Sequence, residues 1–494
     1  MNVQQGKSHR LAKHLRGVHC ASDKSPCLRY TKPMLNSVLQ SIESRRQKSV
    51  EDLKAFLRIP SISAQPAHAK DVQHCAEWIA GNLTEAKLNV QIRPTGGHPI
   101  VLAKNEHKPG RPTVLFYGHY DVQPPEPLDQ WTSPAFEPTV RKTDAGTDAI
   151  YARGAVDDKG QVWAHIEAIT QWQQQGGLPV NITMLIEGEE EVGSENLERF
   201  VHENAAELKA DIAVISDTGQ FARGVPAITY GLRGLVYCEV ILSGPSHDLH
   251  SGMFGGAVPN PANILCEILA SLHDKDLRVN IPGFYDDVTP LTPAERADWA
   301  KLPYNEAAYL KSLDLSSLSG EPGYTTLERA WGRPTCDING LTSGYQGHGA
   351  KTIIPASASA KVSMRLVPNQ DPQKIVDAFE KAIKDRAPKN VKIKILRHGQ
   401  SGAVLVSREG KAMKLASEAV EAGFGKAPTL IREGGSIPVV GLFKRELKID
   451  TLLVGFGLPD DRVHSPNEKM DLDALYAGTR TAAVLYEKLA GLSA

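Results

Sequence analysis

The sequence predicts an α/β protein with a catalytic domain, built on a mostly parallel sheet flanked by helices, and an inserted α+β domain. Between residues 112 and 216, short apolar runs alternate with helical stretches, which is typical of a parallel sheet covered on both faces. This pattern changes near residue 227 and returns near residue 409. At 494 residues the chain is also too long for one ordinary domain, so we expect two.

The catalytic domain is expected over residues 34–226 and 409–494. Its first part opens with helical periodicity over 35–59 and 74–88. The alternating elements that follow are expected as strands over 112–118, 180–187 and 211–216, and as helices over 160–175 and 194–208. After the insertion we expect a helix over 410–424, a strand over 449–457 and a long helix from Asp471.

The inserted domain is expected over residues 227–408. Residues 276–335 are rich in Pro, Gly and Tyr, which favours irregular structure. The regular elements are expected as a strand or hairpin over 227–244, helices over 260–274 and 371–387, and strands over 358–368 and 391–397. This mixture of strands and helices predicts a second, smaller sheet.

The composition is that of a globular protein without a global charge bias. The 56 basic and 57 acidic residues nearly cancel, so we expect no nucleic-acid partner. No apolar run reaches about 18 residues, so we expect no membrane partner. The six cysteines lie far apart without a CxxC pair, which fits a reducing cytoplasm.

The first 33 residues are basic and polar, with one acid, Asp23. They lack the apolar core of a secretory signal. This segment could be a transit peptide, or an extension ahead of a true start near Met34. In either case we expect the segment to be poorly ordered.

Carboxylates and histidines follow five predicted strands. In open α/β sheets, ligands bind beyond the carboxyl ends of the strands. A solvated acidic turn could explain one such strand end, but not five. The residues concerned are His119 and Asp121 after 112–118; Asp157 and Asp158 after 150–156; Glu187, Glu189, Glu190 and Glu191 at 187–191; Asp217 after 211–216; and His464 after 449–457.

These residue types suit a pair of divalent metal ions. Two histidines and at least three carboxylates are a suitable ligand set, and a shared carboxylate would hold the ions roughly 3.5–4 Å apart. His119 and Asp121 share one face of an extended chain, so the carboxylate could orient the imidazole. Each residue alone also has a structural interpretation. His119 could be a hydrogen-bonded core histidine, and His464 could be a surface-loop histidine. Asp157 and Asp158 could be the N-cap and first-turn acid of a helix.

Nine short motifs occur in one order along residues 35–494. They are GHYDVQP, ARGAVDDKG, EGEEEVGS, SDTG, HSGMFGG, GHGAKTIIP, MRLVPN, REGGSIPV and VHSPNEK. Together they resemble the dinuclear metallopeptidase family of carnosinases, cytosolic nonspecific dipeptidases, aminoacylases and glutamate carboxypeptidases. The likeness is strongest to the carnosinase and nonspecific dipeptidase branch.

The resemblance implies a ligand set for two ions, Zn²⁺ or Mn²⁺. His119 and Asp217 resemble the ligands of one ion, Glu191 and His464 those of the other, and Asp157 the bridge between them. Asp121 resembles the residue that orients His119, and Glu190 resembles the general base acting on a metal-bridging water. The family also has a cis peptide at the position of Asp157–Asp158.

The resemblance implies that the inserted domain is a lid and dimerisation domain and that the protein forms a homodimer. His250 resembles a histidine that reaches into the partner subunit's site and stabilises the oxyanion. Thr352 and Arg365 resemble residues that hold the substrate's terminal carboxylate, and Ser436 resembles a further substrate contact. Alone, Arg365 also suits a solvated strand face and His250 a turn.

The expected function is hydrolysis of the amide bond in dipeptides or similar small peptides with a free C-terminal carboxylate. An N-acyl amino acid deacylase or a carboxypeptidase with the same mechanism is the alternative, and a non-catalytic binding protein on the same fold a remote one. A phosphate loop is excluded, because counting from Gly344 puts Ala350 where GxxxxGK[ST] needs lysine.

Overall fold

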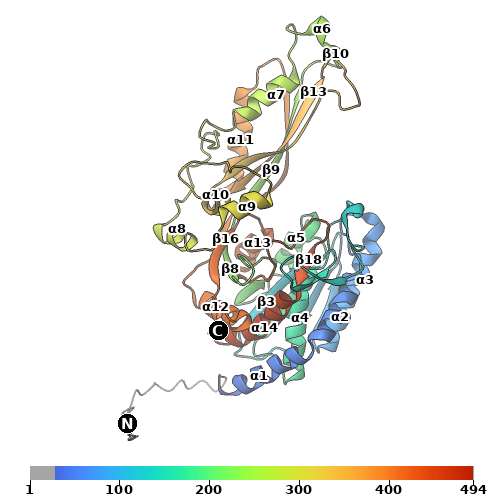
Figure 1. The fold of residues 1–494 in the computed structure, drawn as a ribbon, viewed down its shortest axis with the longest axis vertical. Coiled ribbons are helices and arrows are strands. Elements are labelled where there is room, and N and C mark those ends of the chain that lie inside the picture. The colour runs from blue at the N-terminus through green and yellow to red at the C-terminus, as the bar shows by residue number, and fades with distance from the viewer. Residues whose placement is uncertain (1–27, 493–494) are drawn as a thin grey trace, which may run out of the picture.

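The structure, a computed structural model, describes residues 28–492 (Figure 1). It contains a large lower body and an elongated upper region, which we call the lid, joined along one side. Residues 28–33 of the expected extension belong to the start of helix α1 (Leu28–Ser44). Expectations for residues 1–27 lie outside the described part of the chain. Within that part, no helix is both long and apolar enough to span a membrane.

A nine-stranded sheet runs through the body in the order β1-β2-β6-β3-β7-β17-β8-β15, with β16 paired to β8. Its centre, β6-β3-β7-β17, is parallel, as the sequence predicts. The strands are β1 (Asn89–Arg93), β2 (Ile100–Lys104), β3 (Thr113–His119), β6 (Asn181–Glu187), β7 (Ile212–Ile215), β8 (Ala227–Leu232), β15 (Val404–Leu405), β16 (Thr429–Glu433) and β17 (Thr451–Leu453).

Helices cover both faces of this sheet. Alternate side chains of β3 serve the two faces: Val114 and Phe116 pack into one buried cluster, and Leu115 and Tyr117 into the other. The first cluster includes residues of α1, α2 (Arg46–Leu57), α3 (Ala69–Glu85), α4 (Lys159–Gln174), α12 (Lys411–Phe424) and α14 (Leu472–Leu489). The second includes residues of α5 (Leu197–Glu203) and α13 (Pro438–Leu442). The predicted α/β class is confirmed.

The lid is built on a four-stranded antiparallel sheet in the order β11-β13-β9-β14. Alternate residues of β9, such as Val236 and Val240, are buried against two helices. The strands are β9 (Gly234–Ser243), β11 (Thr335–Ser343), β13 (Ser357–Leu366) and β14 (Lys392–Ser401), and the helices are α7 (Pro261–Ala270) and α11 (Pro372–Arg386). At its far end lie β10 (Leu249–His250), β12 (Ile353–Ile354) and the short helix α6 (Ser251–Phe254) (Figure 1).

The expectation of irregular structure over residues 276–335 is wrong for three short helices and holds for most of the residues between them. This segment contains α8 (Pro293–Trp299), α9 (Glu306–Ser312) and α10 (Thr326–Gly332). Thr292 with Glu295, and Thr325 with Glu328, form capping boxes that begin α8 and α10. These S/T-x-x-E patterns were readable in the sequence, but the surrounding Pro and Gly outweighed them. Trp299 and Trp331 pack against the core of the body.

Two strand assignments differ from expectation. The strand expected over 150–156 is β5 (Asp148–Tyr151), which lies in a separate antiparallel sheet between β4 (Thr139–Lys142) and β18 (Lys469–Asp471). The stretch 227–244 contains two strands, of which β8 belongs to the body sheet and β9 to the lid sheet. We propose the two-domain arrangement that the sequence suggests, but with β8 and β15 assigned to the body, so that the insertion covers residues 233–403 instead of 227–408.

Candidate active site

His119 is the last residue of β3 and is completely buried. The strand approaches α4 so closely here that a Cβ on Gly118 would lie 2.5 Å from Val162 Cγ2. A glycine before His119 therefore lets the strand end sit against the start of this helix. The His119 Nε2 atom faces Asp157 Oδ1 at 3.1 Å and Asp217 Oδ2 at 3.9 Å.

Asp121 ties His119 to the glutamate loop. Its Oδ1 lies 3.4 Å from His119 Nδ1, and its backbone oxygen lies 3.1 Å from the same nitrogen. Its two carboxylate oxygens also accept the backbone N–H groups of Glu190 and Glu191, at 3.2 and 3.0 Å. One buried carboxylate thus fixes both the imidazole and the loop, which is how groups behind metal-bound histidines commonly act.

Asp157 lies between two histidines. Its Oδ1 faces His119, and its Oδ2 lies 2.9 Å from His464 Nε2. The Asp157–Asp158 peptide bond is cis, as the resemblance implies. Asp158 occupies the N-cap position of α4 but makes no side-chain capping bond, and its Oδ2 accepts the His119 backbone N–H instead, at 3.3 Å.

The structure brings the five expected ligands into two overlapping groups. One contains His119, Asp157 and Asp217, and the other contains Asp157, Glu191 and His464. In each group the potential ligand atoms all lie within 4.8 Å of one another. Each group offers an imidazole nitrogen and two carboxylate oxygens, and Asp157 is common to both. This donor set fits two divalent cations that share a carboxylate.

The four glutamates of the sequence EGEEE have different surroundings. Glu187 is buried and accepts hydrogen bonds from Tyr117 and Ser194. Glu189 accepts both its hydrogen bonds from Asn196. Glu191 Oε2 lies 3.2 Å from His464 Nε2. The negative charge is therefore divided between two internal hydrogen-bond networks and the set of five candidate metal ligands. We call this set the metal-ligand cluster; it consists of His119, Asp157, Glu191, Asp217 and His464.

The electrostatics of the cluster also favour a cation. Burial, with repulsion from Asp217, Glu191 and Asp157, raises the pKa of Glu190 to about 8. Burial and the neighbouring Asp157 raise the pKa of Asp217 to about 7. Burial opposes ionisation of Asp157, but hydrogen bonds from His119 and His464 outweigh it and lower its pKa. Bound cations would remove the mutual repulsion of these carboxylates.

Two of the expected substrate residues meet where the lid joins the body. Arg365 Nη1 on β13 donates to Ser436 Oγ at 3.0 Å, although the residues are 71 positions apart. The Ser436 hydroxyl in turn donates to the backbone oxygen of Arg233. Burial lowers the pKa of both Arg233 and Arg365. Two poorly solvated guanidinium groups at this junction suit a carboxylate ligand.

The other two expected substrate residues lie at the far end of the lid. His250 is paired with Ile353 in the β10–β12 sheet, beside Thr352, whose backbone oxygen accepts from Ser251. This end is well separated from the body in Figure 1. The His250 Nδ1 atom accepts the Gly252 N–H at 3.0 Å, so the ring proton resides on Nε2, which is free to donate. Within the described chain, His250 and Thr352 are thus apart from the metal-ligand cluster.

The sequence prediction missed two carboxylates near the cluster. Glu468 is fully buried, pairs with Arg153 at 2.7 Å and accepts the backbone N–H groups of Gly154, Val156 and Asp157. Glu433 ends β16 and accepts a hydrogen bond from Thr229 at 2.8 Å. Both lie in motifs used for the resemblance, VHSPNEK and REGGSIPV. Glu433 follows a strand, which is the signal that identified the other acids.

Comparison with known proteins gives consistent matches along the chain. The model of peptidase family M20/M25/M40 matches residues 115–488. The Cys-Gly metallodipeptidase dug1 of Schizosaccharomyces pombe is 34% identical over 94% of this chain and 100% of its own length. The Beta-Ala-His dipeptidase of Homo sapiens is 31% identical over 93% of both chains. The M20 family metallo-carboxypeptidase Sso-CP2 from Sulfolobus solfataricus has a TM-score of 0.81 and 34% identity, covering 90% of this chain and 99% of its own.

Proposed function

Because this chain belongs to peptidase family M20/M25/M40 and is a metallopeptidase, we propose that it hydrolyses dipeptides with two divalent ions, Zn²⁺ or Mn²⁺. The observation that carries the proposal is the pair of ligand groups that share Asp157. His119 and Asp217 would hold one ion, and Glu191 and His464 the other. Such ions polarise the scissile carbonyl and make a water nucleophilic near neutral pH.

The chain's own residues account for the remaining steps. Glu190, set beside both ligand groups by the Asp121 hydrogen bonds, accepts a proton from the attacking water and passes it to the leaving amine. Asp121 keeps His119 oriented. Arg365 and Ser436 bind the terminal carboxylate of the substrate.

A free amino terminus is favoured by Glu433. Its carboxylate lines the same cavity as Asp157 and Asp217, at a position that suits an ammonium group. An N-acyl amino acid carries no such charge, so this residue supports a dipeptidase over a deacylase. Because the chain is also similar to a metallo-carboxypeptidase, longer peptides are the second candidate class of substrate.

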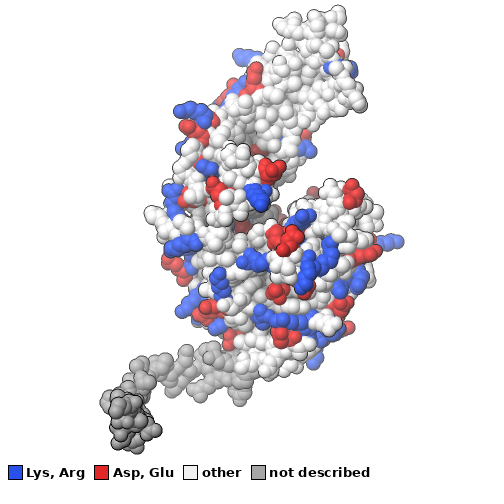
Figure 2. All heavy atoms as spheres, in the orientation of Figure 1, with Lys and Arg blue, Asp and Glu red and all other residues white. Residues whose placement is uncertain are grey.

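The lid end supports a homodimer. Met253 and Phe254 of α6 are 76% and 38% exposed, and Figure 2 shows few charged side chains on the visible face of this end. Lysines, arginines and acids are instead mixed over the body (Figure 2). In the proposed dimer, His250 and Thr352 of one subunit complete the site of the other, with His250 Nε2–H donating to the oxyanion.

A cytoplasmic location is part of the same proposal. Four cysteines, Cys75, Cys238, Cys266 and Cys336, are free thiols in the structure, which suits a reducing compartment. A peptide-degrading enzyme there would act on small peptides released by other peptidases.

Metal removal tests the proposed function directly. Purified protein stripped with a chelator should lose hydrolysis of a dipeptide panel, and Zn²⁺ or Mn²⁺ should restore it. N-acetyl amino acids serve as comparison substrates for the deacylase alternative, and tripeptides for the carboxypeptidase alternative. Full activity in protein verified to be metal-free would exclude the mechanism.

A further inference from the structure

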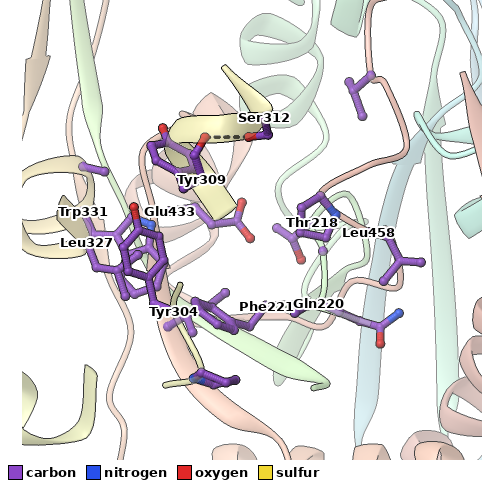
Figure 3. A pocket seen from close by; sticks show the side chains of 18 of the residues that line it. Thr218, Gln220, Phe221, Tyr304, Tyr309, Ser312, Leu327, Trp331, Glu433 and Leu458 are labelled. Carbon is purple, nitrogen blue, oxygen red and sulfur yellow. Dashed lines mark hydrogen bonds between the residues drawn. The ribbon is translucent and has the colours of Figure 1, made fainter. Parts of the chain in front are cut away.

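A cavity of about 780 Å³ opens beside the metal-ligand cluster (Figure 3). Asp157 and Asp217 line it, so a substrate bound at the cluster extends into this space. Its volume is within the range of small-molecule binding sites. It is larger than the space that a substrate's first residue would fill if that residue were glycine or cysteine. The cavity therefore has room that such a small residue would leave to water.

The wall away from the cluster is aromatic and apolar. Trp331, Leu327 and Tyr304 lie together on one side of the cavity, with Tyr309 next to them (Figure 3). Phe221 contacts the Trp331 ring edge-on, with centroids 6.1 Å apart. A wall of this kind stabilises a large apolar side chain by removing it from water.

The charge of the cavity decides which end of a peptide it receives. No lysine, arginine or histidine is among the described residues that line it, and Glu433 is the one acid among them that is not an expected metal ligand. A terminal carboxylate would be repelled here, and an ammonium group attracted. Because Arg233 and Arg365 lie near Ser436 instead, the cavity receives the amino-terminal residue.

The aromatic wall is fixed to the body and does not depend on the far end of the lid. Trp331 packs edge-on against buried Trp299, with centroids 5.3 Å apart. Glu295 of α8 pairs with Arg432 of β16, the strand that ends at Glu433. Helix α8 therefore contacts both the aromatic wall, through Trp299, and the strand that carries Glu433, through Glu295.

We propose that the enzyme prefers dipeptides whose first residue has a large apolar or aromatic side chain, which this wall binds. The inference rests on the proposed dipeptidase function and adds a substrate class to it. An acidic first residue is disfavoured, because the Glu433 carboxylate lines the same cavity and is not an expected metal ligand.

A series of X-Gly dipeptides tests the preference on the metal-loaded enzyme. We expect kcat/KM for Phe-Gly and Leu-Gly to exceed that for Gly-Gly by about tenfold or more, since burial of such a side chain contributes that much. Glu-Gly should be the poorest substrate of the series.

Ala308 allows the wall itself to be tested. It is exposed on α9 and lines the cavity, so Ala308→Trp fills the space from a position that tolerates bulk. Ala307→Trp is the matched control, because Ala307 is exposed on the same helix but does not line the cavity. Only Ala308→Trp should abolish the advantage of Phe-Gly, measured as the ratio of kcat/KM for Phe-Gly to kcat/KM for Gly-Gly within each variant, and Ala307→Trp should keep the wild-type ratio.

The outcomes separate this inference from the function on which it rests. Equal kcat/KM for Gly-Gly and Phe-Gly, Glu-Gly as good as Phe-Gly, or equal effects of the two tryptophans would overturn the preference and leave the dipeptidase intact. No hydrolysis of any X-Gly peptide by the metal-loaded protein would overturn the proposed function itself.

Discussion

The metal-ligand cluster in the body and the far end of the lid differ in how completely one chain builds them. In the body, His119 is fully buried, and Asp121 and Glu468 together accept five backbone N–H groups of the surrounding loops. At the lid end, His250 is exposed on a two-stranded sheet with one local hydrogen bond. The body brings its candidate metal ligands together within one chain, whereas the lid holds His250 apart from them.

This difference teaches that the proposed reaction divides between two surfaces. The ion-binding groups need fixed positions, so they occupy strand ends and buried loops of one domain. The proposed oxyanion donor, His250, needs only to lie within hydrogen-bond distance of the bound substrate. It can therefore belong to a different domain from the metal ligands. Arg365 and Ser436, which meet at the junction, lie between these extremes.

Glu190→Gln should give the largest effect and tests whether the body alone performs the proton transfers. The amide cannot accept a proton, so we expect kcat to fall by about 10²–10⁴-fold while both ions remain bound. Steady-state kinetics together with metal analysis of the purified variant would measure this. Glu189→Gln is the control, since Glu189 is held by Asn196 and should leave the rate near wild type. Near-normal turnover of Glu190→Gln would remove its role as base.

His250→Ala tests the other side of the comparison. Loss of an oxyanion donor should lower kcat by about 10²–10³-fold. If the donor acts across a dimer, mixing His250→Ala with Glu190→Gln subunits should recover activity, because one site of the heterodimer has both groups. His247→Ala, on the exposed loop before β10, is the matched control. Verified heterodimers without any recovery would place His250 outside the partner's site.

Asp121→Asn should have an intermediate effect, on the binding of metal ions. Asparagine loses the charge that orients His119, so we expect metal affinity to fall by about 10–100-fold. Competition with a chelator of known affinity would measure it. Asp248→Asn is the control in the lid, where Asp248 accepts the Ala356 N–H and should not affect metal binding. Equal losses in the two variants would contradict the special position of Asp121.

The sequence predicted the parallel centre of the body because its strands are continuous apolar runs. It failed over 276–335, where helices with clear capping boxes are embedded among Pro and Gly. It also assigned 150–156 to the strand pattern that delivers site residues, although Asp157 comes from a loop after a separate small sheet. Pairing partners of short strands depend on tertiary contacts that one sequence does not display.

The strand-end pattern placed the five candidate ligands within a larger set of acids and histidines, and the resemblance to the family selected the five from that set. Glu468 escaped the same reasoning, since it acts through the backbone N–H groups of residues 154–157, which no spacing rule reveals. The cavity wall escaped it too, because Tyr304, Leu327 and Trp331 look like ordinary core residues until α9 and α10 are placed against the body.

The smallest predicted effect concerns His165, a buried histidine of α4, and it separates the body from the lid by acid sensitivity. Tyr486 donates to its Nδ1 at 2.8 Å, and its Nε2–H donates to Ser216 at 2.7 Å, whose hydroxyl donates to Val454. Burial lowers its pKa to about 3, from about 6.5 in an unfolded chain.

Between these two pKa values only the unfolded state takes up the proton at His165. Stability is therefore retained above pH 6.5 and lost as the pH falls towards 3, by up to about 1.4 kcal/mol per pH unit. His165→Gln should lessen this loss, measured as the protection of α4 amides from hydrogen exchange at pH 7 and pH 5, while the amides of β13 in the lid respond as in wild type. Replacing the exposed His107 by Gln should leave the slope for α4 unchanged. An unchanged slope for α4 in His165→Gln would mean that His165 does not set the acid sensitivity of the body, and an equal change in the slopes for α4 and β13 would mean that the body and the lid unfold together.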